Sequence, residues 1–288
     1  MKSIVIGPWN ISVSEDEIIF PEWAVDNAVN FITRWLRVFP REQTWVVRQY
    51  AIPSLIIRLD CVIKDGKLVI YEIEDRPAGI GVSILASSVF AEKFKELKRL
   101  WPKFEAVISP RRNGSDDEVW LSIAKGPVNG SLVLVRAEPD EKEFHYLGPK
   151  SISTIITEGD KSYGVPLGLW TEVSSADELS WEKGFVLKPL RGSKCKNVEL
   201  WSPGKKGGGI STKSRIIRVL EEQGKMFLQD FVAPMDCPNL QGFSMIYRFC
   251  FGFHPIKNAY VPLGGLWAAR PNQKIHGAGD TIFGPLNF

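Results

Sequence analysis

The chain has 288 residues, of which 44% are hydrophobic and 24% are charged, and its formal net charge is +3. This composition is typical of a soluble globular protein, and the length suffices for one large domain or two ordinary ones with a buried core. Because the charge is nearly balanced, composition gives no support to a nucleic-acid partner.

The N-terminal sequence "MKSIVIGPWN" has one lysine and a short apolar run before Gly7-Pro8, so we expect no secretory signal peptide. No stretch approaches the roughly 20 consecutive apolar residues of a membrane helix. The four cysteines show neither CxxC spacing nor the density of a disulfide scaffold: Cys61, Cys195, Cys237 and Cys250. We therefore expect a cytoplasmic protein without a zinc site.

The first third of the chain predicts helices packed against strands. Apolar positions predict an amphipathic helix over 22–39, with Ala24, Ala28, Phe31, Trp35 and Phe39 on one stripe. A strand-like "TWVVRQYAI", a hairpin over 56–75, a helix from about 83 to 101 and a strand over 104–109 follow. This β-β-α-β unit indicates an α+β domain.

The hairpin "IIRLDCVIKDGKLVIYEIED" places three carboxylates inside its strands. A three-residue loop with a bulge at Gly66 would pair Ile63 with Lys67. That register places Arg58 opposite Glu72, Ile56 opposite Glu74 and Asp60 opposite Ile70. It also puts Arg58, Asp60, Glu72 and Glu74 on one face, whereas a two-residue loop would divide them between the faces.

Three carboxylates on one face call for a cation. Neighbouring like charges destabilise a sheet by about 0.2 to 1 kcal/mol per pair, and Arg58 offsets only part of this. Carboxylate oxygens are the ligands that Mg²⁺ prefers, so the pattern predicts a metal site at Asp60, Glu72 and Glu74. The alternative is a solvated polar face with a surface ion pair.

Short strands are expected near 119–124 and 131–137. Residues 138–180 have too little hydrophobic periodicity to predict an element, and clear patterns return only after them. A hairpin is predicted from "FVLKPL", the loop "RGSKCKN" and "VELW". Residues 203–209 form a linker, Ser211 or Thr212 caps a helix over about 213–223 that Gly224 ends, and a strand over 226–232 follows. Two apolar strand-like runs occupy part of 243–288.

Lys188 lies inside the predicted strand "FVLKPL". A lysine there costs desolvation free energy unless an anion meets it, and a phosphate held partly by backbone N–H groups of the next loop would serve. The alternative is an edge strand whose lysine side chain extends to solvent.

Together these features resemble the ATP-grasp superfamily, and more narrowly its glutathionylspermidine synthase-like branch. In "IRLDCVIKDGKLVIYEIEDRPAG", Arg58, Asp60, Glu72, Asp75 and Pro77 follow that branch's R-x-D, E-x-N and D-x-P motifs in order. "VLKPLRGSKCKNV" is similar to its lysine strand, and "GGLWAARPNQKIHGAGD" to its C-terminal portion. Two departures stand out: Glu74 replaces the metal-site asparagine, and the loop after the lysine strand is poor in glycine.

The resemblance implies an α+β fold of two lobes with mixed or antiparallel sheets that enclose a nucleotide, divided here into 1–150 and 151–288. It implies ATP and Mg²⁺ as cofactors. The implied sites are Mg²⁺ at Asp60 and Glu72 with Glu74 as a third candidate, phosphates at Lys188 and Gly192, and adenine at Gln229 to Phe231.

The function we expect is an ATP-dependent ligase that joins a small-molecule or peptide carboxylate to an amine through an acyl phosphate, without a nucleic-acid or membrane partner. Arg58 is the candidate to hold the carboxylate or the transferring phosphoryl group. Arg248 and Arg270 are candidates for the γ-phosphate, and His276 and Asp280 for the acceptor site. The alternatives are a non-catalytic nucleotide-binding protein and a Trp-rich interaction module. The identity of the substrates and the oligomeric state are not readable from the sequence.

Overall fold

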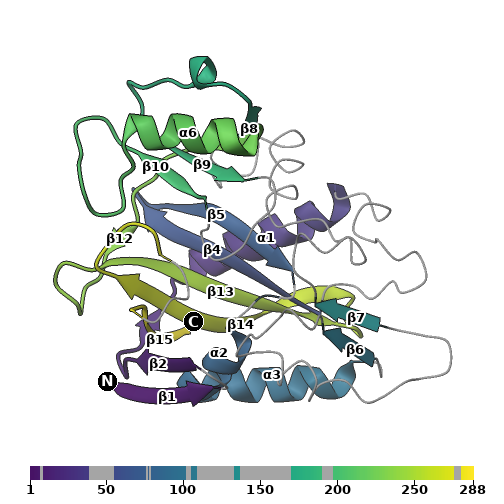
Figure 1. The fold of residues 1–288 in the computed structure, drawn as a ribbon. Helices are drawn as coiled ribbons and strands as arrows, with labels where there is room; N and C mark the ends of the chain where they lie inside the picture. Colours follow the sequence, from purple (N-terminus) through teal and green to yellow (C-terminus); the bar gives the residue numbers. More distant parts are fainter. Residues whose placement is uncertain are drawn as a thin grey trace.

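The computed structural model describes residues 1–6, 9–38, 55–75, 77, 79–101, 105–108, 133–136, 170–189, 197–275 and 280–288. Within these residues a large mixed sheet forms the centre of the molecule, and a smaller antiparallel sheet with one helix lies beside it (Figure 1). The predicted α+β class is confirmed. No helix in these ranges is long and apolar enough to cross a membrane.

The large sheet has the strand order β1-β2-β15-β14-β13-β4-β5, with β12 on β13 and β3 on β15. Its strands are β1 (Lys2–Ile6), β2 (Trp9–Val13), β3 (Ile18–Ile19), β4 (Ile56–Lys64), β5 (Lys67–Asp75), β12 (Met235–Asp236), β13 (Ser244–His254), β14 (Ala259–Arg270) and β15 (Ile282–Asn287). The central strands are antiparallel, and β15 runs parallel to β2 and β3. The sheet therefore joins strands from both sides of the predicted division at residue 150, and that division itself lies outside the described residues.

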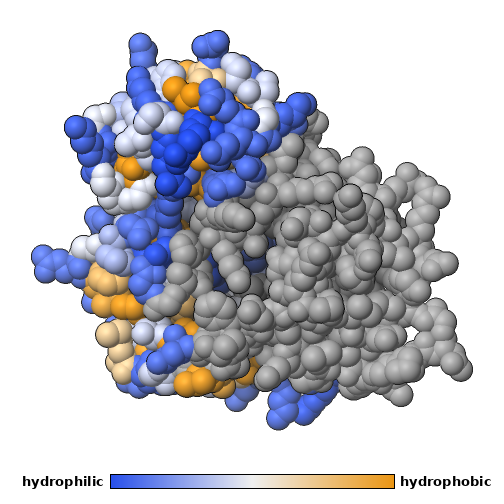
Figure 2. All heavy atoms as spheres, in the orientation of Figure 1, coloured by the Kyte–Doolittle hydropathy of each residue, from blue (hydrophilic) through white to orange (hydrophobic). Residues whose placement is uncertain are grey.

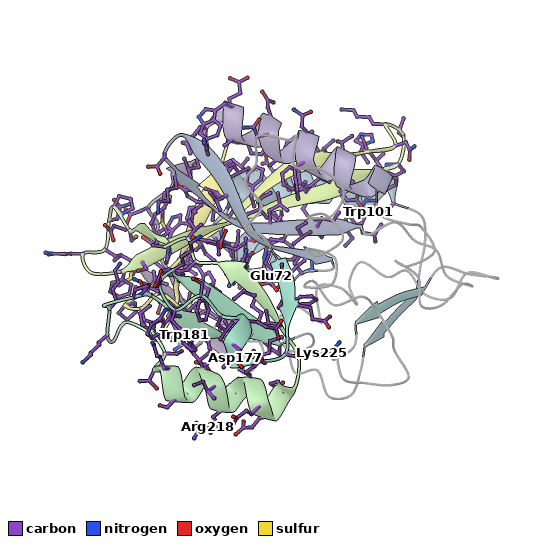
Figure 3. All side chains as sticks on the ribbon, turned by 90° about the horizontal axis from the view of Figure 1, so that it is seen from above. Glu72, Trp101, Asp177, Trp181, Arg218 and Lys225 are labelled. Carbon is purple, nitrogen blue, oxygen red and sulfur yellow. The ribbon has the colours of Figure 1, made fainter. Side chains whose placement is uncertain are left out.

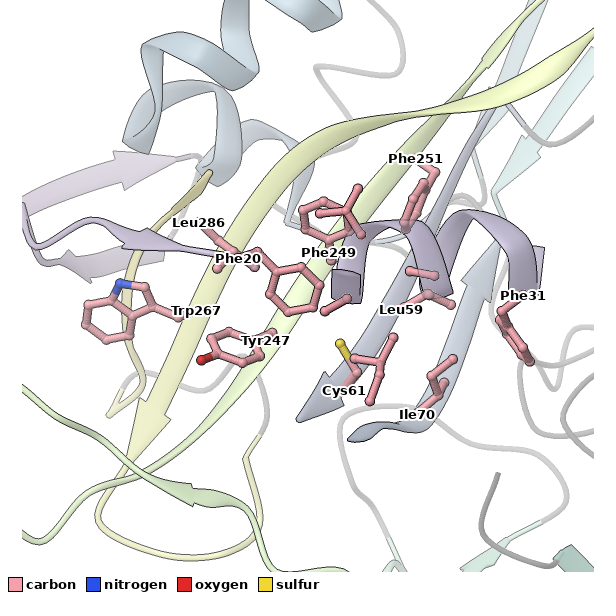
Figure 4. Close-up of a cluster of buried hydrophobic side chains, with 14 of the residues drawn as sticks. Phe20, Phe31, Leu59, Cys61, Ile70, Tyr247, Phe249, Phe251, Trp267 and Leu286 are labelled. Carbon is pink, nitrogen blue, oxygen red and sulfur yellow. The ribbon is translucent and has the colours of Figure 1, made fainter. Parts of the chain in front are cut away.

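One face of the large sheet packs against α1 (Glu22–Val38). The helix contributes three residues of its predicted apolar stripe, the buried Ala24, Ala28 and Phe31. The sheet contributes residues such as Leu59, Cys61, Phe249 and Trp267 (Figure 4). The predicted helix is thus confirmed over 22–38, and its burial forms the main hydrophobic core, while position 39 lies outside the described residues.

The opposite face carries α2 (Ile80–Ala86) and α3 (Ser88–Leu100), where the sequence predicted one helix. Ser87 separates them because its backbone is extended, with φ −131° and ψ 117°. Its hydroxyl accepts the Phe90 N–H at 3.1 Å and donates to Asn287 Oδ1 at 2.9 Å. An N-cap serine that also bonds to the end of β15 therefore starts a new helix within the predicted one.

The small sheet and α6 (Lys213–Gln223) form a second layer, which we call the small layer. The order of the sheet is β10-β9-β11-β8, all antiparallel, from β8 (Trp170–Val173), β9 (Phe185–Pro189), β10 (Glu199–Trp201) and β11 (Met226–Asp230). Helix α6 covers one face with Ile216, Val219 and Leu220, and Thr212 caps it. The predicted hairpin and helix are confirmed, and the outer surface of this layer is largely hydrophilic (Figure 2).

Three shorter features complete the described structure: the single 3-10 turn η1 (Ala176–Glu178) and the parallel pair β6 (Glu105–Ile108) with β7 (Val133–Arg136). The segments predicted as strands at 44–52 and 119–124 lie outside the described residues. The site described next is built from the two larger sheets.

Candidate functional site

The hairpin that carries the three carboxylates closes with a two-residue turn. Lys64 pairs with Lys67, and Asp65 and Gly66 both have positive φ, 51° and 68°. Such a turn matches the right-handed twist of the flanking strands and favours Asp-Gly. The three-residue loop predicted from the sequence is therefore wrong.

A β-bulge on β5 then shifts the register by one residue. Cys61 pairs with Ile70 but Asp60 pairs with Glu72, so Tyr71 is an extra residue without a partner on β4. The shift places Arg58 opposite Glu74. Because opposite residues point to the same side of a sheet, the charged side chains share one face, as predicted, although the predicted pairs are wrong.

Asp60 lies between two arginines on this face. Arg58 binds it through two bonds, Nε to Oδ1 at 2.6 Å and Nη2 to Oδ2 at 3.2 Å, and Arg248 Nε lies 3.6 Å from Oδ2. Arg58 Nη2 also reaches Glu74 Oε2 at 2.9 Å. We refer to Arg58, Asp60, Glu72, Glu74 and Arg248 as the charged cluster.

Burial is what makes this cluster unusual. Arg58, Asp60 and Arg248 are 4%, 6% and 9% exposed, so their charges are removed from water and depend on one another. Burial by itself would lower the pKa of Arg58. The negative charges of Asp60 and Glu74 together have the larger effect, so the pKa of Arg58 lies above its ordinary value. Burial raises the pKa of Glu74, an effect that Arg58 opposes and that Asp60 and Glu72 reinforce.

Part of the positive charge that the hairpin itself lacks is supplied by an arginine of β13. Arg248 pairs directly with Asp60 across the β13–β4 ladder. The hairpin sequence could not show this neighbour, because β13 lies far away in the chain.

Lys188 of β9 joins the two sheets. It is 8% exposed, and its Nζ donates to the Tyr71 carbonyl at 3.1 Å, while the Tyr71 hydroxyl donates to the Val232 carbonyl at 3.0 Å. Lys188 therefore does not extend to solvent. Its ammonium lies against β5 at Tyr71, the residue before Glu72. Figure 1 shows β9 of the small sheet close to β5 of the large sheet.

Gln229 lies on the same face of the small sheet as Lys188, opposite the face that α6 covers. In the β11–β9 ladder Phe227 pairs with Lys188 and Gln229 pairs with Val186, so all four residues point to one side. Gln229 is 2% exposed. Phe231, just past the strand, is half-buried, and its N–H donates to Gly184 O at 3.1 Å. The structure thus brings Gln229 to the side on which Lys188 lies, while Gly192 and His276 fall outside the described residues.

Arg270 lies apart from the charged cluster. Arg248 is opposite Leu266 in the β13–β14 ladder, and Arg270 is four residues further along β14. Its Nη1 donates to Lys274 O at 2.8 Å, and its Nη2 lies 2.5 Å from Asp280 Oδ2. Arg270 and Asp280, predicted to serve the phosphate and the acceptor, bind each other.

A second group of charges, which the sequence analysis missed, centres on Glu199 of β10. Glu199 is fully buried, and Arg215 Nε lies 3.0 Å from both of its oxygens. The Ser211 hydroxyl donates to it, and Lys274 Nζ lies 3.5 Å away while also donating to Val198 O at 2.7 Å. A glutamate between Val198 and Leu200 in a predicted strand was the signal for this group.

The described residues contain no group of three or more His, Cys, Asp or Glu side chains arranged to hold a metal ion. Both oxygens of Asp60 face guanidinium groups. Glu72 is half-buried, and no ion pair or side-chain hydrogen bond links it to another described residue. Of the three predicted metal ligands, Glu72 and Glu74 on β5 thus make fewer ion pairs with described residues than Asp60 does.

Neither a protein-family model nor a curated protein sequence matches the chain. Among solved structures, one similar chain is described as a candidate gamma-glutamylcysteine synthetase from Methylobacillus flagellatus KT. The identity is 10%, the alignment covers 92% of this chain and 85% of that chain, and the TM-score is 0.42.

These comparisons contradict the resemblance to the ATP-grasp superfamily and to its glutathionylspermidine synthase-like branch. The structural match is to a protein described only as a candidate gamma-glutamylcysteine synthetase, and no family model matches. The spacing of charged residues that suggested the family is accounted for by ion pairs within the hairpin itself. Arg58, Asp60 and Glu74 follow that spacing in a hairpin that pairs them with one another.

Proposed function

We propose that the protein is an ATP-dependent ligase that joins a carboxylate to an amine through an acyl phosphate. The observation that carries this proposal is the position of the charged cluster, which lies on buried strands where Lys188 of the small sheet reaches β5. Buried charges with opposed partners, gathered where two layers meet, are frequent at functional sites.

The chemistry needs positive charge around a transferring phosphoryl group more than it needs a covalent catalyst. A substrate carboxylate attacks the γ-phosphorus and ADP leaves; the amine then attacks the acyl carbon, phosphate leaves, and the amine loses its proton. Arg58 and Arg248 supply guanidinium groups suited to carboxylate and phosphate oxygens. Lys188 supplies a compact charge for the phosphates of ATP, and Gln229 lies on the same face of the small sheet for the base.

Mg²⁺ fits Glu72 and Glu74 better than Asp60. The ion is usually held by one or two carboxylates together with phosphate oxygens and water, which two neighbouring positions of β5 can provide. Both oxygens of Asp60 face guanidinium groups, so Asp60 would first have to give up a partner, whereas Glu74 binds Arg58 through Oε2 and Glu72 makes no described ion pair. When bound with ATP, Mg²⁺ would neutralise phosphate charge, while Asp60 would hold Arg58 and Arg248 in place.

A non-catalytic nucleotide-binding protein is the second candidate. The pairing of Asp60 with both arginines favours it, because charges that satisfy one another stabilise a site without requiring turnover. The two candidates share ATP binding and differ in whether phosphate is released.

The experiment is calorimetric titration of the protein with ATP, with and without Mg²⁺, followed by phosphate release from ATP in mixtures of carboxylic acids and amines. Lys188→Met and Glu72→Gln test the site. Lys225→Met is the matched control, because Lys225 (labelled in Figure 3) is exposed and pairs at 2.6 Å with Glu172 of β8, an edge strand of the small sheet. We expect Lys188→Met to weaken ATP binding by about tenfold or more, the scale of a lost hydrogen bond to a charged group, and Lys225→Met to leave it unchanged.

The outcomes separate the candidates. Phosphate release that requires both an acid and an amine supports the ligase. Magnesium-dependent ATP binding without release supports the non-catalytic protein, and absence of ATP binding rejects both.

A further inference from the structure

Tyr71 occupies a special position in the large sheet. It is the extra residue of the bulge on β5, between Ile70, which pairs with Cys61, and Glu72, which pairs with Asp60. An extra residue of this kind leaves the regular ladder, so its backbone can bond to groups outside the sheet.

Both ends of Tyr71 contact the small layer. Its backbone carbonyl accepts the Lys188 ammonium at 3.1 Å, and its side-chain hydroxyl donates to Val232 O at 3.0 Å. Lys188 lies in β9 and Val232 follows β11, and these two strands are neighbours in the small sheet. A single residue of the large sheet therefore holds two adjacent segments of the other sheet.

The surroundings of the ring keep its hydroxyl a permanent donor. Tyr71 is half-buried and packs against a buried apolar cluster that includes Val62, Val69 and Ile246. Burial raises the pKa of the Tyr71 hydroxyl well above its ordinary value, so it stays protonated at neutral pH. Its bond to the Val232 carbonyl is thus available throughout the physiological range.

We propose that Tyr71 is a positioning residue, which holds Lys188 against β5 and so fixes the position of the lysine relative to the charged cluster. The hydroxyl fixes the segment after β11, β11 is bonded to β9, and β9 carries Lys188. The assignment of an ATP-phosphate role to Lys188 rests on the proposed function, but the placement of Lys188 by Tyr71 does not.

The variant that tests the proposal is Tyr71→Phe, because it removes the bond to Val232 while keeping the aromatic ring and the backbone carbonyl. Tyr247→Phe is the matched control. Tyr247 is 8% exposed and lies on the opposite face of the same sheet, among the residues that pack against α1. The two variants lose the same atom from different sides of the sheet.

The first measurement needs no nucleotide. Lysines are labelled with an amine-reactive reagent, and the rate at Lys188 is compared by mass spectrometry with the rate at exposed Lys257 of the same molecule. We expect Tyr71→Phe to raise the relative rate at Lys188 about 2- to 10-fold, which corresponds to the loss of one hydrogen bond. We expect Tyr247→Phe to leave it unchanged. An unchanged rate in Tyr71→Phe, or an equal rise in both variants, overturns the proposal.

The second measurement joins the proposal to function. If the wild type turns over ATP, Tyr71→Phe is expected to raise KM for ATP about 2- to 10-fold with kcat nearly unchanged. A fall in kcat at unchanged KM contradicts a positioning role. A wild type that binds no ATP rejects the proposed function alone, because the labelling rate of Lys188 still decides the role of Tyr71.

Discussion

Asp60 is the residue on which the charged cluster depends, because it faces two buried guanidinium groups. Its removal takes from Arg58, which is 4% exposed, the carboxylate that it binds through two hydrogen bonds. Removing one partner of a buried ion pair costs far more than the pair contributes, since the remaining charge stays desolvated.

We therefore expect Asp60→Asn to lower the free energy of unfolding by about 3 to 5 kcal/mol. Urea denaturation at neutral pH measures this. Glu72→Gln is the control on the same face, and we expect it to change stability by less than about 1 kcal/mol, because the Glu72 carboxylate makes no ion pair with a described residue. Equal effects of the two substitutions would show that Asp60 does not hold the cluster together.

Tyr247 predicts a loss of stability at alkaline pH. Burial raises its pKa to about 12, with Cys61 and Cys237 adding to the shift. Because the folded protein holds this proton more tightly than the unfolded chain, the contribution of Tyr247 is complete below pH 10 and disappears as pH rises through about 12.

The wild type should accordingly lose more stability than Tyr247→Phe between pH 10 and pH 12. The difference between their unfolding free energies should change by up to about 2 to 3 kcal/mol across this range, the equivalent of a shift of about two pKa units. Thermal or urea unfolding at several alkaline pH values checks it. Parallel pH profiles of the two proteins would contradict the prediction.

At the level of single elements, the hairpin shows why a correct conclusion came from a wrong register. The sequence Lys64-Asp65-Gly66 is compatible with two loop lengths, and only the shorter one forms. The shorter loop alone would have moved Glu72 and Glu74 to the other face, but the bulge at Tyr71 moves them back. A local pattern predicts turn and strand, yet the position of the bulge, whose extra residue Tyr71 contacts the second sheet, was not predicted from it.

Helix α6 offers a clean comparison of a buried and an exposed ion pair. Arg215 Nε lies 3.0 Å from Glu199, whose side chain is fully buried, whereas Arg218 lies 3.8 Å from exposed Glu222. Both arginines are themselves more than half exposed. Only the first pair neutralises a charge that water cannot reach.

We expect Arg215→Met to destabilise the protein by about 2 to 4 kcal/mol, and Arg218→Met by less than about 0.5 kcal/mol. The double variant Arg215→Met with Glu199→Gln should recover part of the loss, since it removes the buried charge together with its partner. Denaturation curves of the three variants measure these differences. A loss in Arg218→Met as large as in Arg215→Met would mean that helix propensity, and not the buried carboxylate, sets the cost.

For the whole molecule, sequence patterns predicted the pieces better than their assembly. The α1 stripe, the β9–β10 hairpin and α6 follow from local periodicity. The pairing of β4 with β13 does not, and it is this pairing that brings Arg248 to Asp60. Likewise Glu199 receives Lys274 from beyond β14, a contact that no local spacing indicates.

The two layers are joined at two described places. Tyr71 bonds to Lys188 and Val232 at one, and at the other Lys274 bonds to Val198 O and lies near Glu199, while Gln273 N donates to Gly208 O at 2.9 Å. Lys274 follows the last strand residue of β14 by four positions, so it links the end of the large sheet to β10. Loss of the Lys274 side chain should lower the local stability of the small layer and leave that of the large sheet unchanged.

Hydrogen exchange of Lys274→Met tests this directly. Amides of β9, β11 and α6 should exchange about tenfold faster than in the wild type, because a hydrogen bond from a charged group that joins the layers is lost. Amides of β13 and β14, at the centre of the large sheet, should exchange at wild-type rates. Lys225→Met, whose ion pair with Glu172 stays within the small layer, should change neither set. Faster exchange in both sheets would mean that the two layers open together as one cooperative unit, since Lys274 would then stabilise the whole fold and not its junction.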